Sequence, residues 1–291
     1  MLTRAAETPL RLGIPKGRMY DGVAALLADA AVKLRTGPRD YRPTVLLPGL
    51  EVKVLKPQNI LEMLHAGSRD VGFAGADWVA ELDVDVVELL DTGLDPVRLV
   101  AAAPAELLVD GRLPAGPLVV ASEYERLTKR WINSQGIEAR FVRSYGATEV
   151  FPPEDADCIV DNTASGATLL ANGLEIVGEV ARSSTRLCAH PAALEDPVRR
   201  AAIEQLVTLL RSVLDARRRV MVEVNVPSDR LEEAVAVLPC MREPTISPLH
   251  GEGGYAVKAA VPREQLPTVI TELKACGGTD VVVTKLSQIV S

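Results

Sequence analysis

The pattern of apolar and polar positions changes along the chain and divides it into three parts. Short apolar runs alternate with helical spacings over residues 10–103, and a second alternation of the same kind begins at residue 118. A third pattern, which opens with a strand of period two, begins at residue 220. Strands that alternate with helices are typical of α/β sheets. The pattern therefore predicts a two-lobed α/β body followed by a smaller C-terminal module.

The first part contains a strand, a helix and an expected hairpin. Apolar alternation predicts a strand at residues 10–14, and helical spacing predicts a helix over about 19–31. Two further apolar segments, 45–47 and 52–55, are separated by a Pro-Gly turn and are expected to pair as a β-hairpin. Asp77 follows a strand that ends in small residues, so we expect its carboxylate to cap the next helix.

The second part repeats the alternation. Strands are predicted at residues 118–121 and 139–142, with a helix over 124–135 between them that ends at Gly136. A buried strand at 158–160 then leads into a polar loop.

One long amphipathic helix is predicted over residues 196–219, because its apolar residues recur at spacings of three and four. The helix ends in three consecutive arginines at 217–219. Cations at a helix C-terminus complement the helix dipole, so a solvated helix end is favoured, with a nucleic-acid patch as the alternative.

The C-terminal module reads as strand, helix, strand, strand, helix, strand. This βαββαβ order predicts a ferredoxin-like fold, a four-stranded antiparallel sheet with two helices on one face. Such a module fits either a sensing role or a purely structural role in dimerisation. The predicted strands are 220–226, 245–249, 255–261 and 280–284, and the predicted helices are 228–237 and 263–276.

Composition narrows the classes of function. The 291 residues are 47% hydrophobic and carry a formal net charge of −7, which indicates a globular chain and argues against a broad nucleic-acid surface. The cysteines and histidines lack a metal-type spacing, so we expect reduced thiols and no metal site built from them. No apolar run reaches the ~18 residues of a membrane span, and the N-terminus lacks a signal-peptide pattern. We therefore expect a cytoplasmic protein with no membrane or nucleic-acid partner.

Two segments carry candidate chemistry. Residues 158–174 read as a strand, a small-polar loop and a helix start, where unpaired backbone N–H groups favour an anion. An ordinary strand-to-helix connection, which also favours Ser, Thr and Gly, is the alternative. Lys16 and Arg18 flank Gly17 at the carboxyl end of a strand, where open α/β sheets bind ligands. Two solvated surface cations are the alternative there.

Six motifs connect these features across nearly the whole chain. With them the chain resembles the ATP phosphoribosyltransferase family in its long form, which has a C-terminal regulatory domain. One motif alone is weak evidence, whereas six in the same order with matching separations are strong evidence. The motifs are residues 14–18, Lys56-Pro57 with Ile60, 70–78, 146–149, 157–174 and 238–249.

The resemblance implies a fold that agrees with the predicted parts. Two catalytic lobes of the periplasmic-binding-protein type (type II) would enclose the active site, and the regulatory domain would be ACT-like. The first lobe would comprise residues 10–97 and 187–218, and the second lobe, with the loop for phosphoribosyl pyrophosphate, residues 98–186. The regulatory domain would comprise residues 219–291.

The resemblance also implies the reaction, the first step of histidine biosynthesis. N1 of ATP would attack the anomeric carbon of phosphoribosyl pyrophosphate, giving phosphoribosyl-ATP and pyrophosphate, with Mg²⁺ bound mainly through the substrate polyphosphate. Charge would build on the departing group, so positioned donors and cations matter more than a protein nucleophile. Histidine would be the feedback inhibitor, and the chains would form a homo-hexamer assembled from dimers.

The same resemblance implies the site residues. The polar loop would cradle the 5′-phosphate, Asp161 would accept ribose hydroxyls, and Glu149 would bind ribose hydroxyls or Mg²⁺-bound water. No protein ligand of a metal is implied. The implied catalytic residues are Lys16, Arg18, Glu149 and Asp161; the phosphoribosyl pyrophosphate-binding residues are Asp161, Ala164, Ser165, Gly166, Ala167 and Thr168; the ATP-binding residues are Lys16, Gly17, Arg18, Gly75 and Asp77; and the residues near histidine are Thr245 and Gly278.

The chain departs from the family pattern at the centre of the polar loop, where Asn162, Thr163 and Ala164 stand, and in a slightly shorter connection after Glu149. A divergent paralogue that binds a small molecule without turnover is therefore the alternative hypothesis. A short-form enzyme that needs a separate activating subunit is disfavoured, because the βαββαβ module is present.

Overall fold

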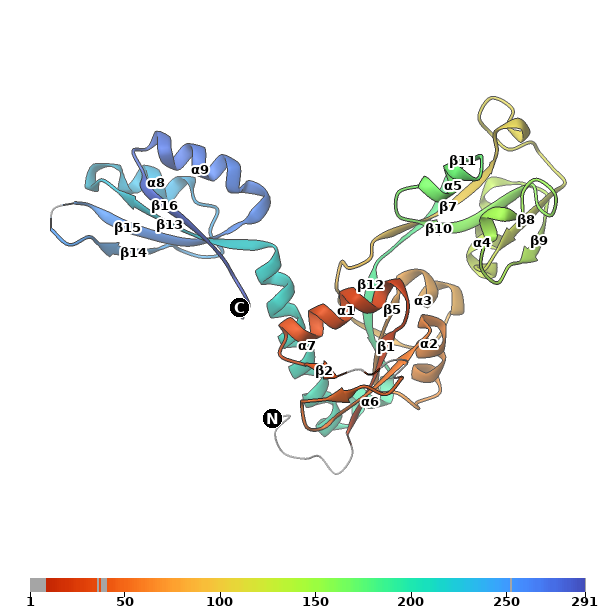
Figure 1. Ribbon diagram of the computed structural model, residues 1–291, viewed down its shortest axis with the longest axis horizontal. Helices are drawn as coiled ribbons and strands as arrows, with labels where there is room; N and C mark the ends of the chain where they lie inside the picture. The colour runs from red at the N-terminus through yellow and green to blue at the C-terminus, as the bar shows by residue number, and fades with distance from the viewer. Residues whose placement is uncertain (1–8, 36, 38–40, 252, 291) are drawn as a thin grey trace. The chain divides into compact units, whose positions relative to one another are not determined.

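The computed structural model describes residues 9–35, 37, 41–251 and 253–290, and Figure 1 shows it as a ribbon. The chain forms two compact units. The first comprises residues up to Ala25 together with Val32–Gln205, and it contains two α/β lobes with separate sheets. The second comprises Leu26–Ala31 and the residues from Leu206 onward. In the part of the chain that the structure describes, no helix has both the length and the apolar character needed to cross a bilayer.

The first lobe is a five-stranded sheet. Its elements are β1 (Leu10–Pro15), α1 (Arg18–Asp29), β4 (Leu50–Leu55), α2 (Pro57–His65), β5 (Val71–Gly75), α3 (Ala76–Leu82), β6 (Val87–Asp91) and β12 (Thr185–Ala189). The strand order is β4-β1-β5-β12-β6, and β12 is antiparallel to both of its neighbours. α2 packs Ile60 and Leu64 against Ala74 and Cys188 of the sheet. β5 is buried throughout, and β1 is buried at every position except Arg11.

The predicted β-hairpin is wrong. β3 (Thr44–Val45) pairs with β2 (Leu34–Arg35), whereas β4 pairs parallel to β1. Val52 and Val54 of β4 are buried in that position, so burial in the main sheet outweighs the local preference of the Pro-Gly turn. The edge strand β6 was not predicted, because it is short and partly exposed.

The expected helix cap at Asp77 is also wrong. Gly75 is the N-cap of α3, without a side-chain cap hydrogen bond, and Asp77 lies inside the first turn. A Cβ at Gly75 would lie 2.1 Å from Asp77 Oδ1, so the conformation of Asp77 requires glycine there. The carboxylate of Asp77 instead accepts hydrogen bonds from Tyr124 and Ser183.

The second lobe is another five-stranded sheet. Its elements are β7 (Val97–Pro104), β8 (Leu118–Ser122), α4 (Glu125–Gln135), β9 (Ala139–Arg143), β10 (Cys158–Thr163), α5 (Ala167–Ala171) and β11 (Leu174–Ser183). The order is β11-β7-β10-β8-β9, in which β10 is antiparallel to β7 and parallel to β8. Leu127 and Trp131 of α4 pack against Leu99 and Val160. The predicted helix end at Gly136 is confirmed, since Gly136 takes a left-handed φ of 67°.

The chain passes twice between the two sheets, after β6 and after β11. Thr92 joins the two crossings, because its amide (3.1 Å) and its hydroxyl (2.7 Å) both donate to the carbonyl of Thr185. Helices α6 (Pro191–Glu195) and α7 (Pro197–Arg217) follow. α7 ends two residues earlier than predicted, because Arg219 already begins the next strand.

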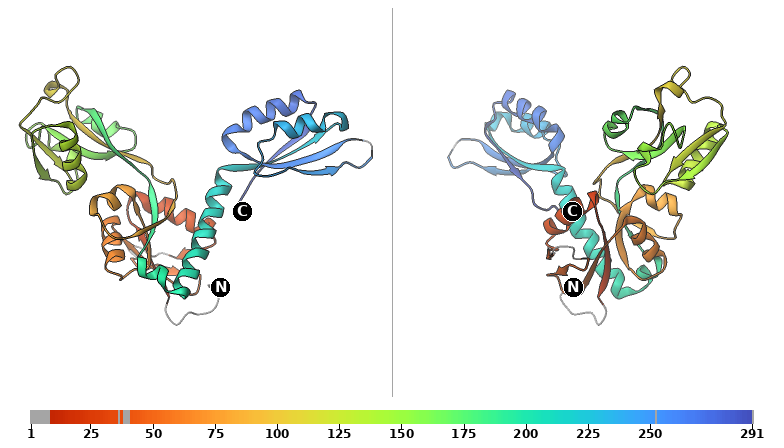
Figure 2. Two further views of the ribbon diagram at one scale, coloured as in Figure 1. Left: turned by 180° about the vertical axis from the view of Figure 1, so that it is seen from behind. Right: turned by 45° about the vertical axis from the view of Figure 1, so that its right-hand side comes forward.

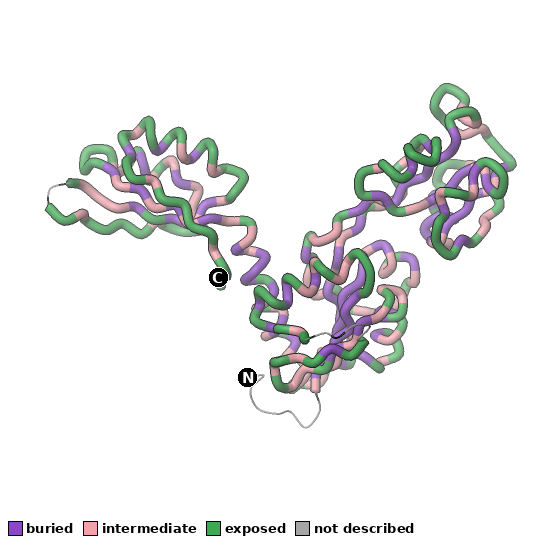
Figure 3. The backbone as a smooth tube through the Cα atoms, in the orientation of Figure 1, coloured by how far each residue is buried: buried purple, intermediate pink, exposed green. Residues whose placement is uncertain are grey.

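The C-terminal module has the predicted βαββαβ fold. Its elements are β13 (Arg219–Val226), α8 (Leu231–Val237), β14 (Thr245–Pro248), β15 (Tyr255–Pro262), α9 (Leu266–Ala275) and β16 (Thr279–Lys285), with short 3-10 turns at Ser228–Arg230 and Arg263–Gln265. All pairings in the order β14-β15-β13-β16 are antiparallel. Figures 1 and 2 show α8 and α9 on the same face of the sheet. Valines at alternate positions of β13, each 1% exposed, face Ala234 and Leu273 of these helices, and Figure 3 shows the resulting alternation of burial.

Gly254 fixes the turn into β15, and its replacement should destabilise this module. Gly254 has a φ of +104°, and an added Cβ would lie 2.1 Å from Val226 O. We expect Gly254→Ala to lower the free energy of unfolding of the module by about 2–3 kcal/mol, because strain and a backbone clash combine. Hydrogen exchange of the β13 and β15 amides measures the loss.

Gly251→Ala is the matched control for this experiment. Gly251 has a φ of +87°, but no described atom lies within 4 Å of an added Cβ, so only the strain of about 1 kcal/mol applies. Equal exchange rates in the two variants would contradict the close packing of Gly254.

Candidate active site

The loop after β10 has the geometry of an anion cradle. β10 extends to Thr163, beyond its predicted end at residue 160, so Asp161 lies within the strand. Thr163 Oγ1 accepts a hydrogen bond from Gly166 N at 2.8 Å, and Gly166 is the left-handed N-cap of α5. This tight turn presents the amides of the first turn of α5, which have no intrahelical partners. The exposed residues around them are Ala164, Ser165, Ala167 and Thr168.

Two carboxyl groups lie at the end of β10. Asp161 Oδ1 accepts a hydrogen bond from Asn162 N at 2.7 Å. Burial raises the pKa of Asp161 to about 6, and the negative charge of Glu149 adds to the increase. Glu149 lies on the 3-10 turn Thr148–Val150, which packs against β10. The structure thus brings together Asp161 and Glu149, two of the predicted catalytic residues.

The carboxylate of Asp77 joins segments of both lobes. Asp77 Oδ1 accepts a hydrogen bond from Ser183 Oγ at 2.7 Å, and Oδ2 accepts one from the Tyr124 hydroxyl at 2.7 Å. The Tyr124 oxygen in turn accepts a hydrogen bond from Asn162 Nδ2 at 3.1 Å. We call these four residues the Asp77 network. Because Asp77 is only 7% exposed, the network offsets the cost of burying its charge.

Further contacts between α3 and α4 support this network. Trp78 stacks on Tyr124 with ring centroids 4.5 Å apart. Glu81 accepts hydrogen bonds from two backbone amides in the first turn of α4, each at 3.0 Å, where a carboxylate is favoured. Burial, followed by the charge of Asp77, raises the pKa of the Tyr124 hydroxyl. Tyr124 therefore remains a hydrogen-bond donor to Asp77.

The Asp77 network reaches the polar loop through Asn162. Asn162 is adjacent to Asp161, and its side-chain amide is the group that contacts Tyr124. The departure from the family pattern at Asn162 therefore has a definite structural role in this chain. It ties the end of β10 to Tyr124, whose hydroxyl donates to Asp77 of the first lobe.

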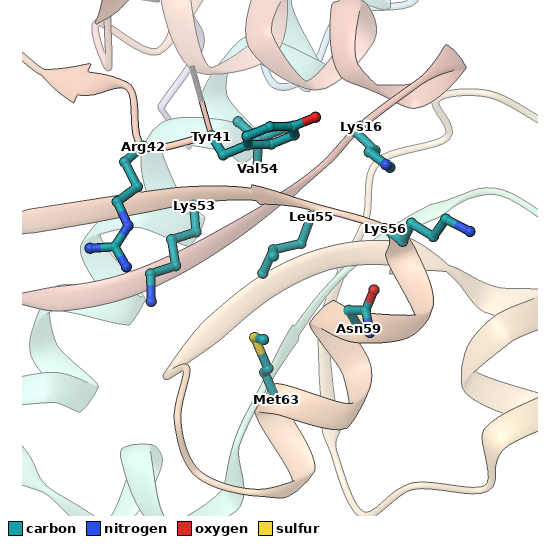
Figure 4. A pocket seen from close by; sticks show the side chains of 9 residues that line it. All are labelled: Lys16, Tyr41, Arg42, Lys53, Val54, Leu55, Lys56, Asn59 and Met63. Carbon is teal, nitrogen blue, oxygen red and sulfur yellow. The ribbon is translucent and has the colours of Figure 1, made fainter. Parts of the chain in front are cut away.

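A pocket of about 370 Å³ in the first lobe carries four cationic side chains (Figure 4). Lys16 and Lys56, from two of the recognised motifs, lie on one side of it, and Arg42 and Lys53 lie on the other. We call it the basic pocket. The charge of Arg69 and then burial lower the pKa of Lys53, as expected where cations crowd together.

Arg42 and Lys53 were missed by sequence reasoning. Lys53 could have been found, because it alternates with the buried residues Val52 and Val54 and must face the other side of β4. Arg42 belongs to no motif, and only the folded chain places it beside Lys53.

The predicted cations and the polar loop belong to different lobes. Gly17 has a φ of +76° and its carbonyl accepts a hydrogen bond from Tyr20 N at 3.0 Å, which places Arg18, exposed, at the start of α1. Within the described ranges, no hydrogen bond or ion pair links Lys16 or Arg18 to residues 161–168.

The two residues predicted to lie near histidine are separated within one chain. Thr245 begins β14 and Gly278 precedes β16, and these strands form opposite edges of the C-terminal sheet. An added Cβ at Gly278 would lie 2.6 Å from Leu273 O, which accounts for the glycine by packing alone. One chain by itself does not combine these two residues into a site.

Comparisons with known proteins identify relatives over nearly the whole chain. The family model described as ATP phosphoribosyltransferase matches residues 56–212, and the model described as HisG, C-terminal domain, matches residues 216–288. The ATP phosphoribosyltransferase of Pelotomaculum thermopropionicum is 35% identical over 286 residues, 97% of this chain and 99% of the relative. That of Chlorobium phaeobacteroides is 34% identical over 276 residues, 93% and 94% of the two chains.

A solved structure is also similar. A chain of the ATP phosphoribosyl transferase (HisG:HisZ) complex from Thermotoga maritima matches with a TM-score of 0.60 and 25% identity. The match covers 69% of this chain and 98% of that one. The folds are therefore shared over nearly all of the Thermotoga chain.

The raised pKa of Asp161 gives a stability effect with a definite sign. Its pKa of about 6 lies above the ordinary 3.8, so the folded state holds the proton more tightly than the unfolded state. The free energy of unfolding should therefore fall as pH rises from about 4 to 6. In Asp161→Asn this loss is absent, so the variant should gain about 1–3 kcal/mol over the wild type between pH 4 and pH 7.5.

Urea unfolding at the two pH values measures this gain. Asp155→Asn, which changes an exposed carboxyl of the same lobe, is the control and should follow the wild type. A constant difference between Asp161→Asn and the wild type at both pH values would contradict the assigned environment.

Proposed function

The chain belongs to the ATP phosphoribosyltransferase family, and we propose that its polar loop and basic pocket bind the two substrates of that reaction. It is an enzyme of the first step of histidine biosynthesis, in which a phosphoribosyl group is transferred to ATP. One observation carries the residue-level proposal. Thr163 and Gly166 form a turn that exposes helix-start amides just after Asp161, whose carboxyl group lies within the electrostatic influence of Glu149.

The polar loop fits the phosphoribosyl part of phosphoribosyl pyrophosphate. Amides of the first turn of α5, with the hydroxyls of Ser165 and Thr168, would donate to the 5′-phosphate. Asp161 would accept hydrogen bonds from the ribose hydroxyls, since a pKa of about 6 leaves it ionised above neutral pH. In the folded chain, these groups would fix the sugar with its anomeric carbon open to attack.

The basic pocket fits the phosphates of ATP or the departing pyrophosphate. Lys16 and Lys56 line it together with Arg42 and Lys53, so it concentrates positive charge in an acidic chain. An anion there would offset the positive charges of Arg69 and Arg42, which together with burial lower the pKa of Lys53. Arg18, exposed at the start of α1, would extend the same surface.

The chemistry needs positioning more than a protein base. N1 of ATP carries a lone pair, which would form the new bond to the anomeric carbon as the bond to pyrophosphate breaks with its electron pair. Charge then builds on pyrophosphate while the sugar becomes cationic, so cations at one end and carboxylates near the ribose lower the barrier. Asp77 is almost fully buried and already accepts hydrogen bonds from Tyr124 and Ser183, so its role would be to position these residues.

Mg²⁺ would be held mainly through the substrate polyphosphate. In the part of the chain that the structure describes, no group of three or more His, Cys, Asp or Glu residues could hold a metal ion. Asp161 and Glu149 supply oxygen acceptors suited to water bound to Mg²⁺. Bound Mg²⁺ would neutralise charge on the departing pyrophosphate.

The C-terminal module would be the regulatory domain of a cytoplasmic enzyme. Because Thr245 and Gly278 lie at opposite edges of its sheet, a histidine site that uses both would need modules of neighbouring subunits. From the family resemblance, histidine would inhibit at such a site within a homo-hexamer assembled from dimers. The coupling between histidine and substrates would be about 1–3 kcal/mol.

Activity measurements test these assignments. With ATP, phosphoribosyl pyrophosphate and Mg²⁺, the protein should form an N1-ribosylated nucleotide, seen by its ultraviolet absorbance, and histidine should inhibit the reaction. Thr168→Val should lower kcat/KM for phosphoribosyl pyrophosphate about 10- to 100-fold, because one donor to a charged phosphate is lost. Lys16→Ala should lower kcat/KM for ATP by a similar factor.

Two exposed substitutions serve as controls. Thr271→Val on α9 and Lys129→Ala on α4 change the same residue types outside the proposed site and should leave activity within about twofold. Turnover in the wild type with no effect of Thr168→Val or Lys16→Ala would show that the substrates bind elsewhere.

A further inference from the structure

A second cationic cavity lies in the second unit, where α7 ends and β13 begins. Its volume is about 710 Å³. Four guanidinium groups and two carboxylates leave a formal charge of +2 in a chain whose net charge is −7. We call it the arginine cavity. The charged side chains that line it are Arg217, Arg218, Arg219, Arg263, Asp215 and Glu264.

Hydrogen bonds to backbone carbonyls hold Arg263 at the end of α7. Arg263 N donates to Arg218 O at 2.9 Å, and Arg263 Nε donates to Arg217 O at 3.4 Å. Arg219 faces Pro262 in the register between β13 and β15. The 3-10 turn after β15 is therefore bound to the end of α7, and the four arginines come from two segments of the chain, residues 217–219 and this turn.

Most of these guanidinium groups retain unused donors. Arg217 pairs with Asp29 at 2.7 Å. Arg219 Nε is buried and has no hydrogen-bond partner among the described residues. Arg218 and Arg263 are exposed, and neither forms an ion pair with a described carboxylate. A buried donor without an acceptor is costly, so an acceptor supplied by a ligand would stabilise Arg219.

The helix dipole alone does not account for this cluster. Arg217 and Arg263 lie at the last carbonyls of α7, where one or two cations complement the dipole. Arg218 and Arg219 add charge beyond that need. Guanidinium forks match pairs of phosphate oxygens, and the cavity is larger than a single phosphate requires.

We propose that the arginine cavity binds a diphosphate group, carried by inorganic pyrophosphate or by a nucleoside diphosphate, at a site separate from the catalytic lobes. The diphosphate would accept hydrogen bonds from Arg218, Arg219 and Arg263. It would thereby join the end of α7 to the first strand of the C-terminal sheet.

Hydrogen–deuterium exchange of the full chain tests this proposal, because it separates this cavity from sites in the first unit. Inorganic pyrophosphate at about 1 mM should slow exchange of the amides of residues 215–222 and 262–266 at least about fivefold. ADP is the second probe. Equal protection by the two ligands would show that the diphosphate alone is recognised, and stronger protection by ADP would show that the nucleoside also contacts the cavity.

Variants identify the groups that bind. Arg218→Gln combined with Arg263→Gln should weaken pyrophosphate binding at least about tenfold, with the urea midpoint unchanged. Arg211→Gln, which changes an exposed arginine of α7 outside the cavity, should bind as the wild type does. Replacing Arg218 and Arg263 by lysine preserves charge but removes the fork, so binding should be intermediate.

Three results would overturn the proposal. The first is unchanged exchange in residues 215–222 and 262–266 with either ligand at about 5 mM. The second is protection that rises with protein concentration in the absence of ligand, because a second copy of the chain would then occupy the cavity. An equal loss of binding in Arg211→Gln would also overturn the assigned site.

Discussion

The buried carboxylate of Asp77 imposes the constraint on which the catalytic body depends. A charge this well buried is tolerated only with strong hydrogen-bond donors. Removal of one donor would leave part of the Asp77 charge without a compensating hydrogen bond. Its donors, Ser183 and Tyr124, come from two separate segments of the second lobe. Asn162 then bonds to Tyr124 from the end of β10. The hydrogen bonds that compensate the Asp77 carboxylate of the first lobe thus also position the polar loop of the second lobe.

Charge is distributed unevenly in a way that suits phosphorylated ligands. The chain as a whole is acidic, yet four cationic side chains line the basic pocket and four arginines line the arginine cavity. At the basic pocket the positive charge of Arg69, then burial and the charge of Arg42, lower the pKa of Lys53. Bound polyphosphate would neutralise part of this positive charge. The repulsion between cations that destabilises the unliganded chain would therefore add to the affinity for the ligand.

The sequence predicted the periodic elements well and the long-range contacts poorly. β13 was predicted because its alternating valines require one buried face, and the end of α4 because Gly136 readily adopts a left-handed conformation. The predicted hairpin is wrong because a turn signal does not determine which strand β4 pairs with in the sheet. The predicted cap at Asp77 is wrong for a related reason. A carboxylate at the start of a helix usually accepts hydrogen bonds from the amides of that helix. Only the folded chain brings the Tyr124 hydroxyl within hydrogen-bond distance of Asp77. Arg42 was missed because no local pattern marks it.

If the Asp77 network positions the polar loop, Tyr124 and Asn162 should act together in binding phosphoribosyl pyrophosphate. A double-mutant cycle on that affinity tests this most directly. Tyr124→Phe, Asn162→Ala and the double variant would be compared with the wild type by isothermal titration calorimetry. Each single change should weaken binding about 5- to 30-fold, and the double change by less than the product, with a coupling of about 0.5–1.5 kcal/mol. Single variants that bind as the wild type does, or losses that multiply without coupling, would contradict the account.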